Sequence, residues 1–138
     1  MKYLLKRLPG LLLLGLFGCG AISASPEIYL AVVNKSSFNL ENVRARFGSY
    51  GCMWGYVGKT FTKSQGVYSH PITEEAELHW EEGGKGNIWK ITTSGVYKSG
   101  TSGALTFTVY DKEIEVSFKD TSGKVTKSVK LKEPLDSK

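Results

Sequence analysis

The segment LTFTVYDKEIEVSF, residues 105–118, decides the fold class of this 138-residue chain. Apolar and polar side chains alternate on both sides of the pair Asp111–Lys112. The apolar members are Leu105, Phe107 and Val109 before the pair, and Ile114, Val116 and Phe118 after it. A two-residue turn sets Val109 opposite Ile114, so that both apolar faces lie on one side. The segment therefore predicts an antiparallel hairpin.

The rest of the chain extends this pattern. A turn at 120–123 leads into Val125–Leu131, and it is expected to set Phe118 opposite Val125. Further runs rich in β-branched and aromatic residues predict strands at Ile28–Asn34, Asn42–Phe47, Tyr56–Thr62, Ala76–Glu81 and Ile88–Thr93. About 7–8 short strands predict an all-β fold, a small antiparallel β-sandwich, with a small barrel as the alternative.

The first residues have a different character. Lys2, Lys6 and Arg7 precede the apolar run Leu11–Phe17, and small residues follow it. A transmembrane helix needs about 20 apolar residues, so this run is too short to span a bilayer. A basic start, a short apolar core and a small-residue exit are typical of an export signal. The alternative is an N-terminal helix of the domain itself.

The residues Leu16-Phe17-Gly18-Cys19 resemble the lipobox of bacterial lipoproteins, although that pattern prefers a small residue where Phe17 stands. The resemblance implies cleavage before Cys19 and a lipid on its sulfur, which would anchor the protein to a membrane. Gly20 stands where an Asp often signals inner-membrane retention, which favours the outer membrane, facing the periplasm. We expect a signal peptide at 1–18, a lipidated linker at 19–27, the domain at 28–133 and a tail at 134–138.

The net charge and the number of cysteines limit the functions that the chain can have. Removing residues 1–18 leaves 15 basic and 13 acidic residues, a net charge of +2. That small charge does not favour a nucleic-acid partner. If Cys19 carries lipid, Cys52 is alone, and it is then a buried thiol, an intermolecular bridge or a reactive group.

A first candidate site is the alternating run from Ala76 to Glu81, whose outer face carries Glu77, His79 and Glu81. These three positions on one strand lie along a line of about 13 Å, so they do not converge on a metal ion. Three more glutamates lie nearby in the chain, at 74, 75 and 82. The run is either an acidic patch for a basic partner or a solvated strand face.

A second candidate is the glycine-rich segment Gly48–Gly58, which we expect to be a loop that carries Tyr50, Trp54 and Tyr56. Exposed aromatic rings on such loops are common recognition devices. The alternative is that Trp54 and Met53 close one end of the core. The glycine spacing matches neither a dinucleotide fingerprint nor a phosphate-binding loop.

A third candidate is the polar loop Thr92–Gly103, where Tyr97 and Lys98 are central and offer part of a contact surface. Basic residues also gather outside the loops. They are Arg44 and Arg46 on one predicted strand face, and Lys124, Lys127, Lys130 and Lys132 near the end of the chain.

These features predict a lipid-anchored domain that binds another protein, for example as an immunity or inhibitor protein against a toxin delivered to the periplasm. The alternatives are a structural or assembly component of an envelope machine, and glycan or small-molecule binding by Tyr50, Trp54 and Tyr56. An enzyme would need Cys52 beside His70 or His79, and no spacing supports that. We therefore expect no catalytic activity, no cofactor and no metal.

Overall fold

The computed structural model describes residues 28–67 and 72–132. These residues form nine β-strands and no helix. The strands are β1 (Ile28–Asn34), β2 (Leu40–Phe47), β3 (Tyr50–Val57), β4 (Thr62–Val67), β5 (Glu75–Glu82), β6 (Lys85–Thr92), β7 (Gly103–Val109), β8 (Glu113–Asp120) and β9 (Val125–Lys132). The all-β prediction is confirmed. The predicted signal, linker and tail lie outside the described residues.

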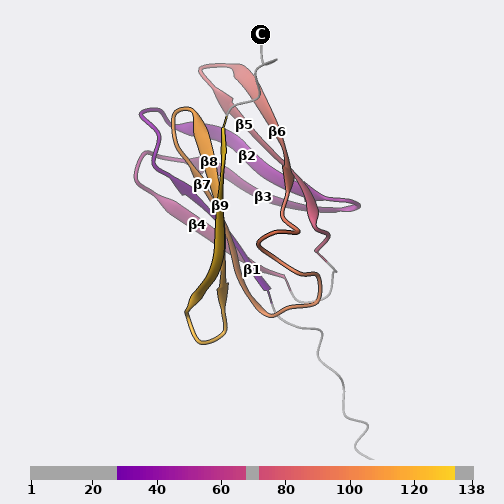
Figure 1. The fold of residues 1–138 in the computed structure, drawn as a ribbon. Helices are drawn as coiled ribbons and strands as arrows, with labels where there is room; N and C mark the ends of the chain where they lie inside the picture. Colours follow the sequence, from indigo (N-terminus) through magenta and orange to yellow (C-terminus); the bar gives the residue numbers. More distant parts are fainter. Residues whose placement is uncertain (1–27, 68–71, 133–138) are drawn as a thin grey trace, which may run out of the picture.

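The strands form two sheets that pack face to face (Figure 1). Sheet A has the order β4-β1-β7-β8-β9, and sheet B has the order β3-β2-β5-β6. Neighbouring strands are antiparallel except β1 and β7, which are parallel because a long connection through both sheets separates them. The predicted sandwich is therefore confirmed, with a mostly antiparallel arrangement.

The two C-terminal hairpins test the predicted register. Val109 pairs with Ile114, and the Tyr110 amide donates to the Glu113 carbonyl at 2.9 Å, as the sequence predicts. The next register is wrong, because Phe118 pairs with Lys127 and not with Val125. An irregularity after Phe118 shifts the pairing by one residue, so that Lys119 pairs with Val125. The rest of the difference lies in the turn, where the Asp120 amide donates to the Lys124 carbonyl at 3.0 Å.

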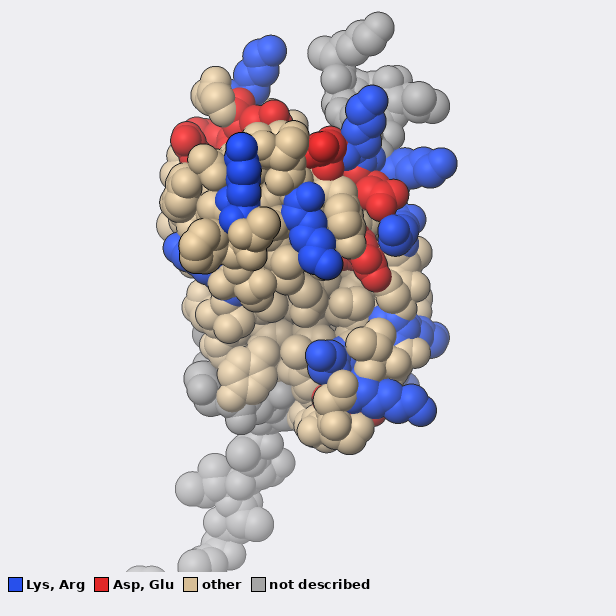
Figure 2. Space-filling model, turned by 90° about the vertical axis from the view of Figure 1, so that its left-hand side faces the viewer, with Lys and Arg blue, Asp and Glu red and all other residues tan. Residues whose placement is uncertain are grey.

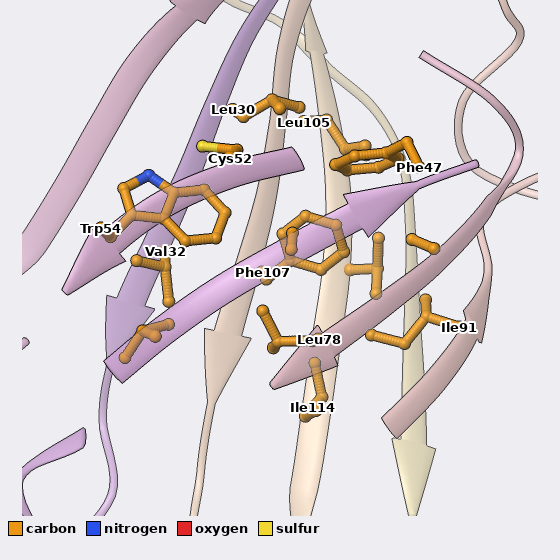
Figure 3. Packing of buried hydrophobic residues seen from close by; sticks show 14 of the residues in the cluster. Leu30, Val32, Phe47, Cys52, Trp54, Leu78, Ile91, Leu105, Phe107 and Ile114 are labelled. Carbon is orange, nitrogen blue, oxygen red and sulfur yellow. The ribbon is translucent and has the colours of Figure 1, made fainter. Parts of the chain in front are cut away.

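The core lies between the two sheets and is centred on Phe107 (Figure 3). The Phe107 ring lies 6.2 Å from the Phe47 ring and 6.5 Å from the Trp54 ring, measured between centroids. Burying one such side chain contributes about 2–3 kcal/mol, so burial alone can hold a domain of this size. The largest fully buried side chains are Phe47, Phe107, Leu30, Leu40, Ile72, Leu78, Ile91, Leu105, Ile114, Val32, Val43 and Val57.

The predicted strand Tyr56–Thr62 is wrong. Two strands stand there instead: β3 ends at Val57, and β4 begins at Thr62 after a turn. Gly55 lies at a positive φ of 69°, where the β2–β3 register shifts, and this irregularity returns Val57 to the buried side. β3 thus runs through the glycine-rich segment that the sequence suggested was a loop.

Asn34 is a buried polar residue at the end of β1. Its Nδ2 donates to the carbonyls of Phe38 and Val57, at 2.9 and 3.0 Å. Its Oδ1 accepts from the backbone amide and the hydroxyl of Ser36. Because its amide group satisfies several buried partners at once, Asn34 fixes the β1–β2 connection against the end of β3.

Candidate functional site

Sheet B exposes one face to solvent because its strands alternate. The inward side chains of β2 include Val43, Ala45 and Phe47, and those of β5 are Ala76, Leu78 and Trp80. The side chains between them point outward. We call this surface the outer B face and define it by Arg44, Arg46, Met53, Glu75, Glu77, His79, Ile88 and Lys90.

One row of the outer B face crosses all four strands. Met53 pairs with Arg44, Arg44 pairs with His79, and His79 pairs with Ile88. Met53 is 69% exposed and Ile88 is 60% exposed, so both ends of the row offer apolar surface to solvent. The row therefore has one exposed apolar side chain at each end, with Arg44 and His79 between them.

The next row carries charge. Arg46 pairs with Glu77, and Glu77 pairs with Lys90. Glu77 also lies 3.1 Å from Nε2 of His79, which joins the two rows, and His79 itself is largely covered by its neighbours. The predicted outward orientation of Glu77 and His79 is confirmed.

Glu81 stands in a third row, opposite Glu41 on β2. Its carboxylate accepts a hydrogen bond from Nδ2 of Asn42 at 3.0 Å. Glu77, His79 and Glu81 thus follow one strand and are each held by a neighbour, and they do not converge on a point. Among residues 28–67 and 72–132, no group of histidine, cysteine, aspartate or glutamate side chains could hold a metal ion.

Two open hollows lie on this side of sheet B. The larger, of about 290 Å³, is lined by Arg46, Gly48, Glu75, Ala76, Glu77 and Lys90. The smaller, of about 110 Å³, includes Arg44, His79 and Ile88 in its lining. Both are lined by side chains of both charges and are open to solvent, whereas a typical small-molecule site is enclosed.

The glycine-rich segment does not form the aromatic platform that the sequence suggested. Trp54 points into the core on β3, and Tyr50 is half-buried and packs against the core. Tyr56 is exposed on the other side of the strand. Alternation alone would place the three rings on one face, because they are an even number of residues apart. The irregularity at Gly55 instead turns Tyr56 to the opposite face from Trp54. The interpretation that Trp54 and Met53 close one end of the core is confirmed for Trp54 and wrong for Met53, which alternation on β3 turns to the exposed side.

The loop between β6 and β7 also differs from expectation. Tyr97 is buried, and its ring lies 5.5 Å from that of Phe118. The Tyr97 amide donates to the Thr93 carbonyl at 2.7 Å, which turns the loop back onto the sheet. Tyr97 is therefore a core residue and not a contact residue, because the loop covers the end of β8. Lys98 remains exposed, as predicted.

Cys52 is a buried thiol. Its side chain points into the core, and its Sγ donates to Oε1 of Gln65 at 3.2 Å. Burial raises the pKa of the Cys52 thiol from 9.0 to about 11, which suppresses the reactive thiolate. His79 lies on the opposite face of sheet B, so these two residues do not form a nucleophile–base pair. His70 and Cys19 lie outside the described residues.

Sequence reasoning missed the apolar members of the outer B face. Ile88 precedes the buried residues Trp89 and Ile91 with the opposite strand parity, and that parity predicts an exposed isoleucine. Met53 lies in a segment that the sequence suggests is a loop, where it is assigned to the core beside Trp54 and not to an exposed face. The pairing of Arg44 with His79 depends on β2 lying beside β5, which no local pattern reveals.

The described residues contain no helix that is long and apolar enough to cross a membrane. No protein-family model matches the chain, and no curated protein matches it. A solved structure does resemble it: the NMR structure of a protein from Eubacterium rectale, with a TM-score of 0.50 and 11% sequence identity. That match covers 85% of this chain and all of the other chain. At this identity the likeness supports the β-sandwich fold alone.

Proposed function

We propose that this protein is a bacterial envelope lipoprotein whose β-sandwich binds another protein. In this proposal a lipid on Cys19 holds it at the outer membrane, facing the periplasm. The lipobox-like residues at 16–19 support the anchor. The outer B face supports the binding role, because it is a broad surface that carries both apolar and charged side chains.

A single observation carries the binding role: Met53 and Ile88 are exposed at the two ends of a row whose centre is Arg44 and His79. Protein interfaces combine exposed Met, aromatic and Arg side chains with a polar rim, and a few such residues supply most of the affinity. The flanking charges of Arg46, Glu77 and Lys90 supply the polar rim here.

Within this proposal the sharpest role is that of an immunity or inhibitor protein, which neutralises a toxin delivered into the periplasm. The second candidate is an assembly component of an envelope machine. Both use a surface of the same kind, and they differ in the partner. Glycan binding by the three aromatic residues is less favoured, since Trp54 is buried.

The test is a pull-down with residues 19–138 carrying Cys19→Ser, from envelope and secreted fractions of the source cells. We expect a partner to be captured by this protein and lost with Ile88→Arg. A single stoichiometric secreted partner supports the inhibitor role, whereas a set of envelope proteins supports the assembly role. Capture of no partner would contradict the proposal.

A matched control uses Phe61, which is 66% exposed and lies outside sheet B, in the turn before β4. Phe61→Arg introduces the same charge as Ile88→Arg, at an apolar residue that is exposed to a similar degree. We expect this variant to retain the partner. Equal loss with Phe61→Arg and Ile88→Arg would mean that the outer B face is not the interface.

The anchor needs its own test. The full chain is expressed in a Gram-negative host with an alkyne-labelled fatty acid, and the membrane fraction is analysed. We expect a labelled protein in that fraction and no label on the Cys19→Ser variant. An unlabelled parent chain would contradict the anchor while leaving the binding role open.

A further inference from the structure

The strand β9 forms a free edge of sheet A. It pairs with β8 on one side, and among residues 28–67 and 72–132 it has no neighbouring strand on the other. Seven of its eight residues are exposed, and the eighth, Leu131, is half-buried. Because no residue of β9 is buried, sheet B does not cover this strand.

This edge offers both backbone and apolar surface. An edge strand presents unpaired amide and carbonyl groups, which form a template for another strand. On the side of β9 that faces sheet B, Val129 continues the row of Val116, and Leu131 continues the row of Ile114. Val129 is 37% exposed because no strand of sheet B lies over it.

The charge of the edge has a single sign. Residues 124–132 contain four lysines and no acidic residue. Lys130 lies 3.1 Å from Glu113, whereas Lys127 and Lys132 have no ion pair within the described part of the chain. The β8–β9 hairpin reaches the lower end of the molecule in Figure 1, and blue side chains predominate at the lower right of Figure 2.

The charge of β9 indicates which kind of strand can pair with its free edge. Two copies of β9 placed edge to edge would bring like charges together, and lysines on edge strands normally oppose such self-association. An incoming strand with acidic side chains instead meets opposite charges at Lys127, Lys130 and Lys132. The same lysines that disfavour a second copy therefore favour an acidic segment.

We infer that the free edge of β9 binds an extended acidic segment of a partner protein, which joins sheet A as a sixth strand. Backbone hydrogen bonds supply affinity in this mode, and side chains at alternate positions supply specificity. Acidic positions face the lysines, and apolar positions face Val129 and Leu131. The inference involves neither Cys19 nor the outer B face, so it stands or falls independently of the proposed function.

The test uses the ¹⁵N-labelled chain from residue 19 with Cys19→Ser, and the synthetic peptide acetyl-EVEITET-amide. In an antiparallel pairing its glutamates face Lys132, Lys130 and Lys127, and its valine and isoleucine face Leu131 and Val129. We expect chemical-shift changes confined to β8 and β9, with slower hydrogen exchange of the β9 amides. The peptide KVKITKT, in which lysine replaces each glutamate, should cause none.

A charge reversal separates binding from folding. The double variant Lys127→Glu/Lys132→Glu should bind EVEITET roughly tenfold more weakly, because two attractive pairs become repulsive. The peptide KVEITKT should then bind this variant better than the parent chain. Recovery by the reversed peptide shows that the variant is folded.

Four results would overturn the inference. They are equal shifts with the acidic and basic peptides, shifts on the outer B face, no shift at millimolar peptide, and concentration-dependent β9 shifts without peptide. The last of these would identify a second copy of this chain as the occupant.

Discussion

The two open sides of the sandwich are built differently. On one side the edge strands β3 and β4 lie close together and are joined between the sheets. Lys63 on β4 donates to the Trp54 carbonyl on β3 at 3.0 Å, and Cys52 on β3 donates to Gln65 on β4 at 3.2 Å. On the other side, within the described residues, no hydrogen bond joins β6 to β9. We call these the closed side and the free side.

The difference shows how one sandwich can be both stable and able to bind. β3 buries Cys52, Trp54 and Val57, so the closed side contributes to the core. β9 buries none of its residues, so it contributes little packing. Strands with few buried contacts open locally at low free-energy cost. The free side can therefore accept a partner without a loss of core packing.

The largest expected loss of stability comes from a substitution in the core of the closed side. Trp54→Ala removes a buried side chain next to Phe107 and should lower the free energy of unfolding by about 3–5 kcal/mol. Val129→Ala on the free side should lower it by less than about 1 kcal/mol. Both values are measured by denaturant unfolding.

The control for this pair is Trp54→Phe. It retains an aromatic ring and removes an indole N–H that has no hydrogen-bond partner in the described part of the chain. Trp54→Phe should lower the free energy of unfolding by less than about half as much as Trp54→Ala does. Similar losses for Trp54→Ala and Val129→Ala would mean that the two sides do not differ in stability.

The next effect concerns Asn34, which joins β1 to the end of β3 on the closed side. Asn34→Ala removes the side-chain amide that donates to the Val57 and Phe38 carbonyls, although Phe38 keeps its bond from the Ser36 hydroxyl, and should cost about 2–4 kcal/mol. Ser36→Ala removes bonds only at the neighbouring turn and should cost about 1 kcal/mol. Thermal unfolding of both variants measures the two losses of stability. A larger loss for Ser36→Ala than for Asn34→Ala would contradict this prediction.

The strands of the sandwich also differ in how far the sequence predicts them. The β7–β8 hairpin and the outward positions of β5 follow from strict alternation, which is a local signal. On the closed side, β3 carries glycines at 51 and 55, and the irregularity at Gly55 breaks the alternation. β4 has a single buried residue, Val67, so its sequence resembles a loop. Its strand character comes from pairing with β1, which is distant in sequence.

The candidate site divides in the same way. Alternation alone predicts that Glu77, His79 and Glu81 share a face. Their neighbours Arg44 and Ile88 come from the sheet order, which sets long-range pairs. The prediction that Tyr97 is a contact residue is wrong for a related reason, because the Phe118 ring against which it packs lies on a strand two elements later. A polar loop sequence does not reveal that one of its residues fills the core.

A smaller effect is the pH dependence caused by Cys52 on the closed side. Burial raises the pKa of its thiol to about 11 in the folded state, from 9.0 in the unfolded chain. Its contribution to stability is therefore complete below pH 9 and is lost as the pH rises towards 11. The free energy of unfolding should fall over this window, and the fall should be smaller in Cys52→Ala. An aromatic disulfide reagent should react slowly with folded Cys52 near pH 8, and rapid reaction would contradict the closed arrangement.

The smallest effect tests what holds β9 in place. Glu115 on β8 accepts a hydrogen bond from the Ser128 hydroxyl on β9 at 2.6 Å, and this bond lowers the pKa of the Glu115 carboxyl. A lowered folded-state pKa gives stability that is present above the usual value and is lost as the pH falls below it. Glu115→Gln should therefore flatten the acid limb of the stability profile slightly, and Ser128→Ala should do the same. This bond joins β9 to β8 and does not reach β1. Its removal should therefore speed the hydrogen exchange of the β9 amides and leave the exchange of the β1 amides unchanged. Equal acceleration in both strands would show that β9 opens only with the whole domain, and the free side would then be no more available to a partner than the closed one.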